Sequence, residues 1–213
     1  MKGYYMKGRF SGVLFLSLGI LCGSCKNKEG ATASPPLTNS STPPGKEPGI
    51  IINLDKSPLD MSYFPVDYPK LIMSGIAREP LVARVIYSRP KKDGRIIFGN
   101  VVKYGSRWRL GANEASEIEF FTDVTIQNTL IKKNRYIIYC IPFDNKWTVI
   151  LSKDLFTWGL KIDSTKETYN FDVPVLKVPF PMEYFTMTFE KADKGLQLVM
   201  AWDTIKAILP ITD

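Results

Sequence analysis

The sequence predicts an all-β protein, an antiparallel β-sandwich or a partly open barrel with only a few short helical turns. Three observations support this fold class. Apolar and polar residues alternate along many short runs, turn-forming residues separate the runs, and successive runs begin about ten residues apart. The alternation is clearest in residues 184–190, where Phe185, Met187 and Phe189 share one face of a strand.

Eight runs carry the strand pattern: residues 82–88, 117–122, 135–141, 146–152, 172–178, 184–190, 196–202 and 204–211. A tight turn is expected at Asp203-Thr204, so that the last three runs form an antiparallel meander. Residues 98–104 and 153–158 have a weak helical pattern, sufficient for a turn or two. Residues 60–73 are rich in aromatic residues and proline, and we expect an irregular arm packed on the sheet.

The first 25 residues have the features of a lipoprotein signal peptide. Lys2, Lys7 and Arg9 precede an apolar run of twelve residues, 10–21, which is too short to span a bilayer. Two small residues, Gly23 and Ser24, then precede Cys25, as in a bacterial lipobox. The sequence therefore predicts a lipidated Cys25. Cleavage of an ordinary secretory signal nearby is the alternative.

Residues 26–49 contain five prolines with many serines and threonines and no aromatic residue, so we expect a disordered tether. Residues 50–213 are then a single β-domain, with an N-terminal arm over residues 50–80. Lys26, and not aspartate, follows Cys25, which favours the outer membrane over the inner one. The expected partner is thus the membrane of the cell envelope, reached through the lipid anchor.

Composition excludes several function classes. The chain has no histidine, which excludes Ser-His and Cys-His catalysis and histidine-based metal sites. Cys140 is the one cysteine beyond residue 25, so the domain has no internal disulfide, and its position in an apolar run predicts a buried thiol. Removing Lys2, Lys7 and Arg9 lowers the formal charge from +7 to +4. We therefore expect no nucleic-acid partner, no metal and no cofactor.

The sequence resembles the bacterial domain of unknown function 2911. The run from Trp108 to Ala115, Trp-Arg-Leu-Gly-Ala-Asn-Glu-Ala, carries the resemblance most specifically. Further matching segments are residues 87–90, 94–99, 101–107, 141–142, 147–150, 153–154, 158–159, Trp202 and 210–211. The resemblance covers about residues 80–213, departing where Leu110 replaces a residue such as threonine and Lys103 replaces proline. It implies an envelope lipoprotein and no known activity.

The densest mixture of polar and aromatic residues lies in residues 94–118, among four glycines. Polar groups that converge beside aromatic rings on an irregular backbone are typical of binding sites. Arginine offers a planar fork of donors suited to a carboxylate, phosphate or sulfate, and an aromatic neighbour suits a sugar ring. The candidate ligand-binding residues are Arg89, Arg95, Tyr104, Trp108, Arg109, Asn113 and Glu114.

A structural role for the same residues is the main alternative. Arg109 and Glu114 are expected to form an ion pair across the loop, with Asn113 bonding its own backbone. Such a pair keeps Glu114 ionised, which argues against a general acid working with Glu117. Ser88 and Lys91 have the Ser-x-x-Lys spacing of some acyl enzymes, but Pro90 argues against the helical turn that this chemistry needs.

The sequence thus predicts an envelope lipoprotein whose β-domain binds an anionic or carbohydrate-like ligand, or a partner, without catalysis. Two alternatives stay open: a carboxylate-dependent hydrolase acting on envelope carbohydrate, and a purely structural assembly subunit with a large exposed apolar patch. The oligomeric state is not predicted.

Overall fold

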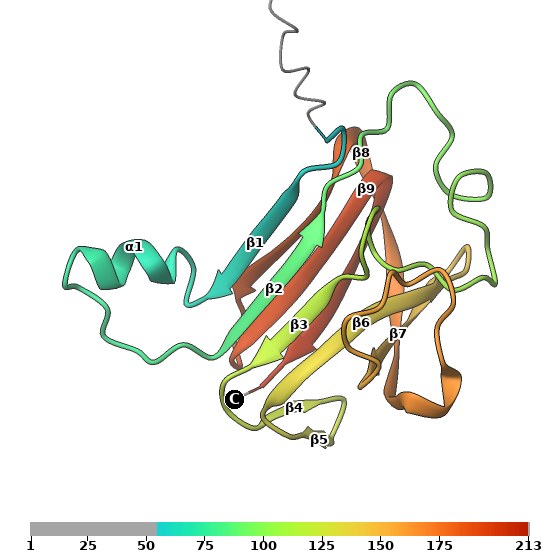
Figure 1. Ribbon diagram of the computed structural model, residues 1–213. Coiled ribbons are helices and arrows are strands. Elements are labelled where there is room, and N and C mark those ends of the chain that lie inside the picture. Colours follow the sequence, from blue (N-terminus) through green and yellow to red (C-terminus); the bar gives the residue numbers. More distant parts are fainter. Residues whose placement is uncertain (1–54, 213) are drawn as a thin grey trace, which may run out of the picture. The chain divides into compact units, whose positions relative to one another are not determined.

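The computed structural model describes residues 55–212, shown in colour in Figure 1. The predicted signal peptide, the lipidated Cys25 and the tether over residues 26–49 lie outside the described residues. Within residues 55–212, no helix has the length and the apolar character needed to cross a membrane.

Seven antiparallel strands form one sheet in the order β1-β2-β3-β6-β7-β8-β9. Their bounds are Leu59–Phe64 (β1), Ala83–Ser88 (β2), Glu117–Phe120 (β3), Asn134–Pro142 (β6), Lys146–Ser152 (β7), Glu167–Lys191 (β8) and Leu196–Ile211 (β9). A hairpin of β4 (Val124–Ile126) and β5 (Thr129–Ile131), an α-helix α1 (Tyr68–Met73) and a 3-10 helix η1 (Ser164–Lys166) complete the described part.

The sheet is nearly closed because the long strand β8 bends back towards the chain that follows β2. The first half of β8 pairs with β7, ending at Pro174 opposite Lys146, and its second half pairs with β9. Beyond the bend, β8 meets the chain that follows β2. Lys91 and Tyr184 form an isolated bridge there, and the Phe185 N–H donates to the Pro90 carbonyl at 3.0 Å. Figure 1 shows β8 and β9 passing behind β1, β2 and β3. The predicted all-β fold, in its partly open barrel form, is confirmed.

Alternation of apolar and polar residues along the strands places the core on the inner face of the nearly closed sheet. Phe185, Met187 and Phe189 of β8 are buried on one face, as predicted, and they pack with Trp147 of β7 and Trp202 of β9. Cys140 lies in the same core, fully buried, and this burial raises the pKa of its thiol well above the ordinary value. The thiol is therefore protonated and inert at neutral pH.

A second, smaller apolar cluster lies on the other face of β6 and β7. It comprises Ala115, Ile137, Tyr139 and Ile150, with Leu155 and Ile162 packed against it. Those last two residues belong to the connection between β7 and β8, so this connection covers the outer face of the two strands.

The predicted turn at Asp203-Thr204 is wrong, because β9 runs without interruption from Leu196 to Ile211. Asp203 has a left-handed backbone (φ 51°) opposite a register shift at Met182, so it bends the strand without ending it. Likewise, residues 172–178 and 184–190 belong to one irregular strand, β8, and not to two. Asp203 has the backbone conformation of a turn residue, but it does not end β9 because pairing with β8 continues on both sides of it.

The expected irregular arm over residues 60–73 is also wrong. Residues 59–64 pair with β2 along the full length of β1, and residues 68–73 form α1. No residue of α1 is buried, and Val66, Ile72, Met73 and Ile76 are exposed. The helical turns expected at 98–104 and 153–158 are absent, since those residues form turns and bends. The β4–β5 hairpin was not predicted.

The buried hydroxyl of Tyr87 gives the fold a measurable alkaline limit. Burial, the largest effect, raises the pKa of Tyr87 from 10.0 to about 12. Between these values the unfolded chain ionises and the folded chain does not. The contribution of Tyr87 to the free energy of unfolding is therefore fully present below pH 10. It decreases by about 2 kcal/mol as the pH rises towards 12.

We predict that Tyr87→Phe reduces the loss of stability between pH 9 and pH 12, measured by urea unfolding at each pH. At neutral pH the variant loses about 1 kcal/mol or less of folding free energy, because it lacks the hydrogen bond that the Tyr87 hydroxyl donates to Asp60 Oδ2 at 3.3 Å. An alkaline slope equal to that of the wild type would contradict the assignment.

Candidate functional site

A cleft of about 380 Å³ opens beside the connection between β2 and β3, the green segment that follows β2 in Figure 1. Three arginines, Arg95, Arg107 and Arg109, and two tryptophans, Trp108 and Trp202, contribute to its wall. No aspartate or glutamate is among the described residues that line it. A cavity of this size with convergent cationic groups and aromatic rings is suited to a small anionic ligand.

Trp108 fixes the wall of the cleft to the core. Its N–H donates to the Cys140 carbonyl at 2.8 Å, and the Cys140 N–H donates back at 2.9 Å. Its ring lies 4.9 to 6.0 Å, centre to centre, from the rings of Phe98, Trp147, Phe185 and Trp202. The connection thus behaves locally as an added strand on β6, and Arg107 and Arg109 are held on either side of an immobile residue.

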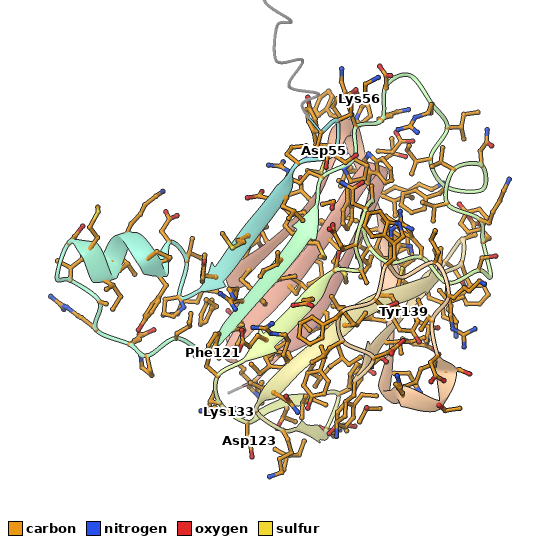
Figure 2. The ribbon with its side chains drawn as sticks, in the orientation of Figure 1. Asp55, Lys56, Phe121, Asp123, Lys133 and Tyr139 are labelled. Atoms are coloured by element: carbon orange, nitrogen blue, oxygen red, sulfur yellow. The ribbon has the colours of Figure 1, made fainter. Side chains whose placement is uncertain are left out.

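Arg107 is neutralised by the protein itself. Its Nη2 and Nε donate to Glu167 Oε1 at 2.8 and 3.1 Å, and the Tyr139 hydroxyl donates to the same oxygen. The hydrogen bond to Glu167 is the main reason that the pKa of Arg107 is raised. Tyr139, labelled in Figure 2, lies on β6 and Glu167 begins β8, so the trio joins the cleft wall to the sheet.

Arg109 has a different environment. Its Nε–H is buried and has no hydrogen-bond partner among the described residues, and no described carboxylate lies within 4.0 Å of its guanidinium. Burial, the one cause, lowers the pKa of Arg109. The structure therefore holds a partly desolvated cation at the cleft without supplying its counter-ion, which is costly unless something else supplies it.

Gly159 allows the Arg109 side chain to lie where it does. A Cβ at this position would meet Arg109 Cβ at 3.0 Å and Ala115 Cβ at 2.9 Å, and the glycine has φ +78°. Both the close approach and the backbone conformation therefore require glycine. The β7–β8 connection packs through Gly159 on the aliphatic part of Arg109, which orients the guanidinium.

Arg95 also lines the cleft. Its Nε donates to the Lys92 carbonyl at 2.9 Å and its Nη2 donates to the Lys91 carbonyl. Both acceptors are neutral, and no described carboxylate lies within 4.0 Å of it. Arg95 is thus held in place while its charge stays available to a ligand.

The family model for "Protein of unknown function (DUF2911)" matches residues 77–211. The chain belongs to this family. The match confirms the resemblance carried by Trp108–Ala115, and that run contains both the anchoring tryptophan and Arg109. No curated protein and no solved structure matched the chain. Family membership leaves the activity open, so the chemistry of the cleft has to be argued from its own residues.

Only part of the predicted site of this DUF2911 member comes together. Arg95, Trp108 and Arg109 line the cleft, whereas Arg89, Tyr104, Asn113 and Glu114 do not. Arg107 and Trp202 were missed as site residues. The sequence held a signal for Arg107, which adjoins Trp108. It held none for Trp202, which reaches the cleft from β9 through the fold.

Arg89 is a structural clamp. It forms an ion pair with Asp60 of β1 at 3.1 Å and donates to Thr186 Oγ1 and the Phe185 carbonyl of β8, at 3.1 and 3.4 Å. It thereby holds the open edge of the sheet together. Arg89 is not among the residues that line the cleft.

Asn113 and Tyr104 have other positions. The Asn113 amide donates to Asp55 Oδ2 and to the Ser57 carbonyl, which fixes the chain where it enters the domain. Figure 2 labels Asp55 at that entry. Asn113 does adopt a left-handed turn (φ 58°). Tyr104 is exposed, with its ring against Gly99.

The expected ion pair between Arg109 and Glu114 is wrong. Glu114 is exposed, and no ion pair joins it to Arg109. The loop turns at Leu110 and Asn113, both with positive φ, and this separates two side chains that spacing alone had paired.

The enzyme alternatives find little support in the described residues. Glu117 lies in a ladder of ion pairs on β3 and β6, with Arg135 at 3.6 Å, and not in the cleft. Ser88 is fully buried, which argues against a nucleophile. Residues 55–212 contain no group of three or more histidine, cysteine, aspartate or glutamate side chains that could hold a metal ion.

Arg89 and Arg109 should respond oppositely to the same substitution. We predict that Arg89→Met lowers the free energy of unfolding by about 1–3 kcal/mol, because it removes the ion pair with Asp60 and the hydrogen bonds to Thr186 and the Phe185 carbonyl. Arg109→Met should leave stability within about 0.5 kcal/mol of wild type or raise it, since it removes an unpaired cation and keeps the aliphatic stem. Urea unfolding of the two variants checks both. An equal loss in both would assign Arg109 to the fold.

Proposed function

We propose that this domain binds an anionic, sugar-like ligand in the cleft, without chemical turnover, as a lipid-anchored protein of the cell envelope. One observation carries the proposal: Arg109 presents at the cleft a partly desolvated guanidinium that has no described carboxylate within 4.0 Å. A ligand carboxylate, sulfate or phosphate would supply the counter-charge.

The charge balance of the cleft supports an anion over a cation or a neutral ligand. Arg107 is satisfied by Glu167, so it contributes positioning more than net charge. Arg95 and Arg109 remain without described carboxylate partners. Two uncompensated guanidinium groups around a small cavity attract an anion and reject a cation.

The aromatic part of the wall supports a ring-shaped ligand. Trp108 and Trp202 both line the cleft, and their rings stack at 5.9 Å with an interplanar angle of 22°. Trp108 is half-buried and Trp202 is 2% exposed, so Trp108 gives most of the apolar surface beside the cationic groups. A sugar acid has this combination, with C–H groups on one face of the ring and a carboxylate at its edge.

Absence of turnover follows from the residues available. General acid–base cleavage of a glycosidic bond requires two carboxyl groups about 5–9.5 Å apart across the scissile bond. The described lining of the cleft supplies no carboxyl group at all. Binding is therefore favoured over the hydrolase alternative.

Location in the envelope rests on the sequence. The basic start, the apolar run of twelve residues and the small residues before Cys25 support a lipid anchor, and Lys26 favours the outer membrane. The Pro/Ser/Thr-rich segment 26–49 has the composition of a tether. A binding domain on such a tether would sample ligands near the membrane surface.

We predict that D-galacturonate raises the melting temperature of the full-length protein purified in detergent. At a ligand concentration 100 times Kd, binding adds about 2.7 kcal/mol to stability. Arg109→Met should abolish this rise. Arg78→Met, which removes an exposed arginine outside the cleft, should preserve it. Glucose 6-sulfate and glucose 6-phosphate, tested alongside, identify which anion is preferred.

Two results would contradict the proposal. If none of the three anions shifts the melting temperature, the cleft is not an anionic sugar site. The exposed apolar residues around α1 would then favour the structural-subunit alternative. If a shift occurs and Arg109→Met retains it in full, the ligand binds elsewhere.

The anchor is tested separately by Cys25→Ser. Incorporation of a radiolabelled fatty acid should be lost, and the protein should move from the membrane fraction to the soluble fraction. Ser24→Thr, a conservative change beside it, serves as the control and should retain labelling. Labelling that persists in Cys25→Ser would place the lipid on another residue and contradict the assignment of Cys25.

A further inference from the structure

A second cavity adjoins the cleft. It has a volume of about 730 Å³ and shares two wall residues with the cleft, Ser57 and Arg95. Its other wall residues include Lys56, which Figure 2 labels near the start of β1, with Lys91 and Tyr184. Because Arg95 belongs to both walls, the two cavities meet at this cation, and together they are treated as one groove. We call it the two-part groove.

The wall of the two-part groove holds more basic than acidic residues. Five are basic, Lys56, Lys91, Arg95, Arg107 and Arg109, and two are acidic, Asp55 and Asp93. Asp55 already accepts hydrogen bonds from the Asn113 amide and from the Ser57 N–H. Lys91 forms an ion pair with Glu183 at 3.8 Å, whereas Lys56 has no ion pair with a described residue. Lys56 thus adds an unpaired cation beyond Arg95.

An exposed aromatic ring lies in the second cavity as well. Tyr184 is 44% exposed, and the Arg89 guanidinium lies 5.9 Å from the centre of its ring. Arg89 is fixed by Asp60 and Thr186, so the tyrosine has a rigid support. Each part of the groove thus has an aromatic surface beside at least one cation that no described carboxylate pairs with, Arg109 in the first part and Lys56 in the second.

Resting on the proposed function, we infer that the ligand is a chain of acidic sugars, and that the two-part groove binds at least two of its units. Arg109 with Trp108 and Trp202 holds one anionic unit. Lys91 and Lys56 with Tyr184 hold another, and Arg95 contacts the chain where it passes between them. A single sugar acid would occupy only the first part and leave Lys56, in the second part, without an anionic partner.

Chain length is the decisive variable. Isothermal titration of the full-length protein in detergent compares D-galacturonate with tetragalacturonate, with maltotetraose as the neutral chain of equal length. Four equivalent units on one chain increase the apparent affinity about fourfold by number alone, whereas occupation of two linked sites gives a larger gain. We expect tetragalacturonate to bind at least about tenfold more tightly than galacturonate, and maltotetraose not to bind.

The second part of the groove is tested by Lys56→Gln with Lys91→Gln. This double variant should bind galacturonate as the wild type does and should lose the additional gain with tetragalacturonate. Lys177→Gln with Lys194→Gln removes the same charge from exposed positions outside the groove and should retain the gain. The gain should also decrease as ionic strength rises.

Each outcome decides between the two claims. Equal affinity for galacturonate and tetragalacturonate, after correction for the number of units, would overturn the chain inference and leave the proposed function intact. A full gain in the Lys56/Lys91 variant would also overturn it. No binding of either acid would contradict the proposed function itself.

Discussion

The position of Trp108 is the constraint on which the rest of the site depends. Its backbone exchanges two hydrogen bonds with Cys140 and its ring is surrounded by four other aromatic rings. A long connection that would otherwise be mobile is thereby fixed to the centre of a nearly closed sheet. Because the backbone of Trp108 is fixed, the neighbouring residues Arg107 and Arg109 extend from a segment that the core holds in place.

The two arginines that flank Trp108, Arg107 and Arg109, have different electrostatic partners. Arg107 meets Glu167 and Tyr139, which tie the connection to β6 and β8. Arg109 meets the glycine of another connection, which packs on its stem and leaves its charge without a described partner. Arg107 therefore stabilises the wall of the cleft, and Arg109 is the group that we propose binds the anionic ligand. Arg95, held only by carbonyl groups, extends the same property along the groove.

Period-two alternation was sufficient to predict the all-β class and most of the strands, because burial of one face dictates that pattern. It could not show that Asp203 bends β9 without ending it, since pairing with β8 decides that. Nor could it reveal β1, whose aromatic and proline-rich flank obscured its alternation. In the site, proximity in sequence identified Trp108 and Arg109. The Arg89 clamp and the Trp202 wall depend on β8 and β9 folding back, contacts that lie more than 90 residues away along the chain.

The central claim is that Arg109 provides the donor for an anionic ligand. NMR observation of the arginine Nε–H groups tests it most directly, with the signal of Arg109 assigned by its loss in Arg109→Met. On titration with D-galacturonate, this signal should shift progressively as the charge of the ligand approaches the guanidinium, while that of Arg89, already bonded to Phe185, stays in place. A saturating titration that leaves the Arg109 signal unmoved, or that moves the Arg89 signal instead, would contradict the account.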